Sequence, residues 1–129
     1  MRSIFLLIMG WFFSFSVHAL GLGGMTVYSD LSQPMNAEIE IVRASSGELP
    51  KLNIGLASPT IFKQNGVPYM HSLQRLNFVV EDKGNGLSVI KVSSTDPIRE
   101  PVVEFVLDVS WPKGHLRRIY SAIINQPDF

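Results

Sequence analysis

Four basic side chains lie close together near the end of the sequence and form its basic cluster. They are Lys113, His115, Arg117 and Arg118. Charges on an outer strand discourage stray pairing between sheets, and they can equally contact an acidic partner or a glycan. Adjacent residues of a regular strand point to opposite faces, so Arg117 and Arg118 are expected on different sides. Edge protection is the favoured interpretation, and a possible partner contact through these four residues stays open beside it.

The other residues that could do chemistry form no catalytic or metal-binding pattern. Glu38 and Glu40 share one face of a predicted strand, but its alternation puts them opposite the apolar face, where a solvated surface is expected. His71 and His115 lie far apart and lack a spaced carboxylate partner. The chain has no cysteine and no Gly-x-Ser-x-Gly elbow. We therefore predict that the protein is not an enzyme and that it uses no metal and no cofactor.

Composition indicates one compact domain. The chain has 129 residues, of which eleven are Lys or Arg and eleven are Asp or Glu. A near-neutral domain has no long-range field for binding nucleic acid or an anionic bilayer. Hydrophobic residues make up 46% and charged residues 17%, which argues against disorder. Without cysteine there is no disulfide, so packing alone must stabilise the fold.

The first nineteen residues have the pattern of a cleavable export signal. Arg2 supplies a positive start, residues 4–17 form an apolar run, and Val17-His18-Ala19 precedes a cut before Leu20. The run is shorter than the roughly 20 residues of a membrane anchor. We predict a signal peptide over 1–19 and a mature domain over 20–129, with no membrane span in the mature chain.

Alternating apolar and polar residues predict seven short strands. A flexible segment over 20–24 is expected before the first strand, which begins at Met25. The other six are expected near 35–43, 52–56, 76–80, 87–93, 103–110 and 116–125. Between the third and fourth strands, Ser58 can cap a helix of about two turns, Pro59 can open it and Gly66 can end it.

Turn signals separate these strands at nearly regular spacing. Residues 82–86 supply the glycines of a hairpin, while Asp96-Pro97 and Glu100-Pro101 are expected to break the chain. This pattern predicts an all-β fold, a seven-strand immunoglobulin-like β-sandwich with one short crossover helix. The predicted core comprises Ile39, Ile41, Phe78, Val80, Phe105, Leu107, Val109 and Tyr120. Tyr69 and Trp111, at strand ends, are expected to cover it, although exposed rings there would indicate a binding surface.

Five segments, taken in order, resemble those of a known family. They are residues 19–23, 31–39, 56–59, 93–101 and 109–114. The most specific are Leu-Ser-Gln-Pro-Met-Asn-Ala-Glu-Ile and the pair Glu-Pro and Ser-Trp-Pro-Lys-Gly. Over its whole mature length, the chain resembles the N-terminal periplasmic domain of FimV-type proteins, the pilus-assembly and cell-pole hub family of Gram-negative bacteria.

The resemblance implies a non-catalytic protein-interaction role in type IV pilus assembly, twitching motility or cell-pole organisation. The implied location is the periplasm, and the implied partners are envelope proteins of pilus assembly or a second copy of the chain. In that family a peptidoglycan-binding LysM module usually follows this domain, whereas this sequence stops at Phe129, so peptidoglycan binding is doubtful. The alternative is a peptidoglycan- or glycan-binding envelope module.

Overall fold

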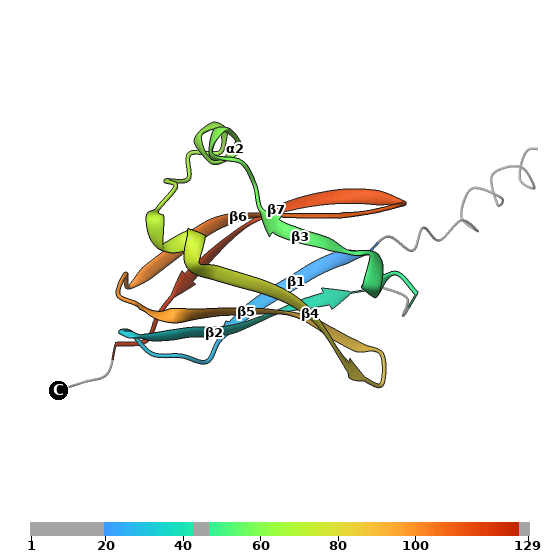
Figure 1. Ribbon diagram of the computed structural model, residues 1–129, viewed down its shortest axis with the longest axis horizontal. Helices are drawn as coiled ribbons and strands as arrows, with labels where there is room; N and C mark the ends of the chain where they lie inside the picture. The colour runs from blue at the N-terminus through green and yellow to red at the C-terminus, as the bar shows by residue number, and fades with distance from the viewer. Residues whose placement is uncertain (1–19, 43–46, 127–129) are drawn as a thin grey trace, which may run out of the picture.

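The two layers of a β-sandwich make up the molecule (Figure 1). The computed structural model describes residues 20–42 and 47–126, and this part of the chain contains seven strands. One sheet holds, in order, β1 (Gly21–Val27), β2 (Gln33–Val42), β5 (Leu87–Ile98) and β4 (Leu76–Gly84). The other holds β3 (Asn53–Leu56), β6 (Val102–Trp111) and β7 (Gly114–Ile123). Every strand pair is antiparallel, and the predicted fold class is confirmed.

A short helix carries the chain from one sheet to the other, as the sequence predicts. It is α2 (Pro59–Gln64), and it lies between β3 and β4 in the chain. The Ser58 hydroxyl accepts a hydrogen bond from the Ile61 N–H at 3.3 Å, and Gly66 follows the helix with φ of 70°. Two 3-10 turns were not predicted, η2 (Leu49–Lys51) and η3 (His71–Arg75).

The core lies between the sheets and follows the predicted inward faces in most strands. Six of the eight predicted core residues are buried: Ile39, Ile41, Phe105, Leu107, Val109 and Tyr120. Phe78 and Val80 are only half-buried, which corrects the prediction for these two. They point inward from β4, but β4 is the edge of the wider sheet, and β3 covers it only in part.

The predicted flexible segment over 20–24 is wrong, because most of it belongs to β1. Leu20 and Leu22 are buried in the core, and the strand begins at Gly21. A Cβ on Gly21 would lie 3.1 Å from Val42 Cγ2, and one on Gly23 would lie 3.1 Å from Glu40 Cβ. These glycines therefore permit close pairing of β1 with β2, rather than a loose connection.

The expected break at Asp96-Pro97 is also wrong, because β5 continues through it to Ile98. Pro97 lies opposite Pro34 of β2, so two residues without an N–H face each other at a register shift. The Ser94 hydroxyl accepts a hydrogen bond from the Met35 N–H at 2.7 Å and donates one to the Asp96 carbonyl at 2.7 Å. This hydroxyl supplies the partners that the irregular ladder lacks.

Candidate functional site

The last hairpin does not hold its four basic residues as one patch. Lys113 is exposed at the turn between β6 and β7, and His115 and Arg117 lie on the outer face of the sheet. Arg117 donates to both carboxylate oxygens of Asp108, at 2.6 and 3.3 Å. His115 Nε2 is 3.7 Å from the same carboxylate. Asp108, on the neighbouring strand β6, therefore offsets the charge of Arg117, and its hydrogen bond raises the pKa of Arg117.

Arg118 has a different role, because it points to the inner side of β7, as the alternation predicts. Its guanidinium donates to the carbonyls of Leu22 and Gly23 in β1. It also lies 5.0 Å from the ring centroid of Tyr120, whose hydroxyl donates to the Gly23 carbonyl at 2.8 Å. Arg118 and Tyr120 thus join the edge of one sheet to the edge of the other and close this side of the sandwich.

Tyr120 gives this closure a dependence on pH. Burial raises the pKa of its hydroxyl above the ordinary value of 10.0, against the opposing effect of nearby Arg118. Because the folded state favours the neutral phenol, its contribution to stability is complete below the unfolded-state pKa and is lost as the pH rises through the folded-state value. We expect urea titrations above pH 10 to show a steeper loss of stability in the native chain than in Tyr120→Phe. Equal slopes would contradict this role.

The sequence predicts that Glu38 lies on a solvated strand surface. In the structure it lies on the outer face of the four-stranded sheet, but two side chains bind its carboxylate. Lys83 Nζ lies 2.7 Å from one carboxylate oxygen, and the Tyr28 hydroxyl donates to the other at 3.1 Å. Its side chain is 14% exposed. The hydrogen bond from Lys83 lowers the pKa of Glu38. Glu38, on β2, therefore carries a negative charge that connects Tyr28, just after β1, with Lys83 near the end of β4.

Trp111 and Tyr69, the two aromatic residues predicted to cover the core, both pack against neighbouring residues. Trp111 is half-buried and packs on the core, and a Cβ on Gly114 would lie 2.8 Å from its Cζ2 atom. The Ser-Trp-Pro-Lys-Gly segment thus forms a tight hairpin in which glycine makes room for the indole. Tyr69 is 36% exposed, and its ring packs edge-on against Phe62 with centroids 4.8 Å apart.

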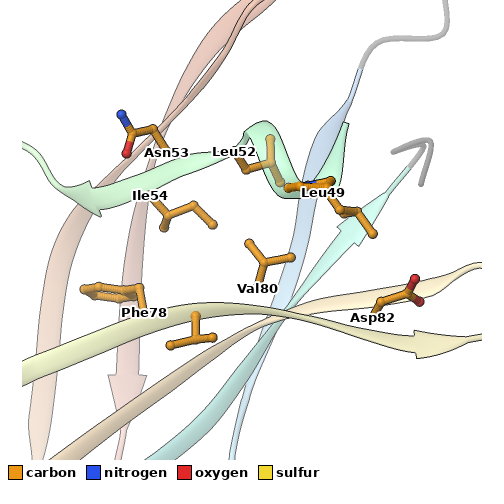
Figure 2. Close-up of a pocket in the computed structure, with 9 residues that line it drawn as sticks. Leu49, Leu52, Asn53, Ile54, Phe78, Val80 and Asp82 are labelled. Carbon is orange, nitrogen blue, oxygen red and sulfur yellow. The ribbon is translucent and has the colours of Figure 1, made fainter. Parts of the chain in front are cut away.

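The sequence did not predict a groove that lies on the side of the sandwich opposite to the one closed by β1 and β7. It has a volume of about 550 Å³ and lies between β4 on one side and η2 with β3 on the other (Figure 2). Its lining consists of Leu49, Pro50, Leu52, Asn53, Ile54, Phe78, Val79, Val80 and Asp82. Figure 2 shows Ile54 directed from β3 toward Phe78 and Val80 on β4. The sequence predicts that Phe78 and Val80 face inward, but it gives no signal that the opposite sheet leaves them partly uncovered.

The geometry gives no support for a metal centre. Within residues 20–42 and 47–126, no three His, Asp or Glu side chains lie together in a way that could hold an ion. In the same part of the chain, no helix is long and apolar enough to cross a membrane. Among the described residues, the groove and the last hairpin remain as candidate contact surfaces.

The fold defines the class of protein: an immunoglobulin-like β-sandwich domain with one closed and one open side. The model of the FimV N-terminal domain, described as an Ig-like domain, matches residues 20–127, and the chain belongs to this family. It is 40% identical over 110 residues to the motility hub protein FimV of Pseudomonas aeruginosa, in both strain PAO1 and strain UCBPP-PA14. The match covers 85% of this chain but 12% of each relative. No solved structure matches the chain significantly.

Proposed function

We propose that this chain is a non-catalytic periplasmic protein-interaction domain that serves type IV pilus assembly, twitching motility or cell-pole organisation. The observation that carries the proposal is the groove between β3 and β4, in which the apolar side chains of Ile54, Phe78 and Val80 are only partly buried. Apolar side chains that a fold leaves uncovered favour contact with another molecule. The relatives are named motility hub proteins, which supports a role in assembling other proteins.

The last hairpin is the second proposed contact, in a reduced form. Both arginine side chains are exposed, but Arg117 already pairs with Asp108 and Arg118 already donates to the Gly23 carbonyl, so we expect Lys113 and His115 to be the more available members. Charges at the rim of an interface change association rates and salt dependence more than affinity. We therefore expect this hairpin to steer an acidic partner rather than to hold it.

The periplasmic location rests on the export signal over residues 1–19, which lies outside the described residues. The family match begins at residue 20, which supports a mature domain that starts there. N-terminal sequencing of the periplasmic fraction is expected to return Leu20 as the first residue. An intact Met1 start in the membrane fraction would contradict the cleaved signal.

Three assays test the interaction role against the peptidoglycan-binding alternative. Chemical crosslinking in cells is expected to join the chain to envelope proteins of the pilus machinery, and deletion of the chain is expected to impair twitching. Purified sacculi are expected to leave the mature domain in the supernatant. Sacculus binding that is lost in Trp111→Ala or Tyr69→Ala, without protein crosslinks, would favour the glycan-binding alternative.

A further inference from the structure

The two sheets differ in width, and this leaves one strand without a partner layer. The sheet of β1, β2, β5 and β4 has four strands, whereas the sheet of β3, β6 and β7 has three. At one side, β7 lies against β1, where Arg118 joins the layers. At the other side, β4 extends beyond β3, so its inward side chains Phe78 and Val80 stay half-buried. The position beside β3 is therefore the place for a fourth strand.

The free edge of β3 has the backbone groups that such a strand needs. The Ala57 N–H donates to the Val106 carbonyl of β6 at 2.9 Å. Alternate residues of an antiparallel strand bond to the same neighbour, so Gly55 faces β6 through its backbone. The N–H and C=O groups of Ile54 and Leu56 then point the other way, to the free edge. A strand added there would place alternate side chains on the inner face, over Phe78 and Val80.

The charge in the groove indicates the chemistry of the occupant. Of its nine lining residues, Asp82 is the one with a charged side chain. One of its carboxylate oxygens accepts a hydrogen bond from the Gly84 N–H at 2.9 Å, and no basic group of the described residues pairs with it. Figure 2 places Asp82 below Leu49, at the end of the groove where β3 begins. A complementary ligand is apolar along its length and basic at that end.

We propose that the groove binds an extended segment of another envelope protein, which adds to β3 as an antiparallel fourth strand. Its alternate apolar side chains enter the groove, and a Lys or Arg near its C-terminal end faces Asp82. We choose the antiparallel direction because antiparallel pairing is slightly more stable than parallel pairing, and because every strand pair in this fold is antiparallel. Main-chain hydrogen bonds provide affinity in this mode, and the pockets for alternate side chains provide specificity. The inference rests on the proposed function and assigns it a surface and a partner.

The probe is a synthetic octapeptide of alternating threonine and valine, acetylated, amidated and ending in lysine, with a glutamate-ended peptide as its control. Hydrogen exchange of the mature domain is followed residue by residue. The Ile54 and Leu56 amides are expected to exchange fast in the free domain and to become protected by the lysine-ended peptide. The same peptide is expected to bind more tightly than the glutamate-ended one.

Two pairs of variants locate the binding. Val80→Glu is expected to abolish binding, whereas Val102→Glu, the same change on the outer face of β6, is expected to leave it unchanged. Asp82→Asn keeps the acceptor for the Gly84 N–H and removes the charge. It is expected to lower the affinity for the lysine-ended peptide about two- to fivefold, which is the effect of one exposed ion pair. Glu81→Gln is expected to leave this affinity unchanged. If Val80→Glu does not fold by circular dichroism, the Asp82 pair decides.

Several results would overturn the inference. They are absence of protection by either peptide at millimolar concentration, protection on the free edge of β4 in place of β3, and equal affinities of Asp82→Asn and the native domain for the lysine-ended peptide. A domain that dimerises in the ultracentrifuge with Ile54 and Leu56 already protected would assign the edge to a second copy. None of these results by itself removes the proposed function, because crosslinking and twitching in cells test that function whichever surface of the domain the partner contacts. Loss of both crosslinks and motility effects would instead remove the proposed function.

Discussion

Replacement of Phe105 by alanine is expected to lower the free energy of unfolding by about 3–5 kcal/mol. Phe105 is fully buried on β6, the central strand of its sheet, and its ring lies 5.8 Å from those of both Phe78 and Tyr120. The change removes the ring and leaves a cavity that three strands cannot close. Because domains of this size are stable by only about 5–15 kcal/mol, the variant should be close to unfolding.

Urea unfolding of the mature domain measures this effect. Val102→Ala is the matched control, since Val102 lies on the same strand but is 47% exposed on the outer face. Its effect is expected to stay within about 0.5 kcal/mol. A cost below about 1 kcal/mol for Phe105→Ala would mean that the inner face of β6 tolerates a cavity, contrary to the packing described above.

Arg118→Ala is expected to destabilise the domain by about 1.5–3 kcal/mol, the range for hydrogen bonds that involve a charged group. The variant loses the bonds to the carbonyls of Leu22 and Gly23 and the contact with the Tyr120 ring. Arg117→Ala, one residue away, loses an exposed ion pair with Asp108 and should lower the free energy of unfolding far less than Arg118→Ala does. Comparison of these two variants thus distinguishes the effect of closing the sandwich from the effect of a charge on its surface.

The same urea titrations compare the two variants, with Arg118→Lys as a further control. Lysine keeps the charge but lacks the planar group that reaches two carbonyls and stacks on an aromatic ring, so only part of the stability should return. Equal costs for Arg117→Ala and Arg118→Ala would mean that both arginines belong to a surface patch. The closed side would then depend on Tyr120 and on apolar packing.

Local patterns in the sequence determined most of the fold. The alternation over 35–43 and 103–110 assigned Ile39 and Phe105 to the core, because a strand repeats every two residues whatever lies beside it. Ser58 and Pro59 marked the crossover helix, and Gly86, with φ of 75°, marked a hairpin. Each of these signals acts within a few residues, so a single sequence is enough to identify it.

The tertiary structure decided which side chains at the edges of the two sheets are covered. Phe78 and Phe105 both read as inward-facing, and only the order of strands in each sheet leaves the first half-exposed in a groove while the second is fully covered. Arg118 read as part of a basic cluster, but β1, 95 residues earlier in the chain, supplies its carbonyl acceptor. Alternation fixes the face on which a side chain lies. What covers that face depends on strands distant in sequence, and no local pattern records their placement.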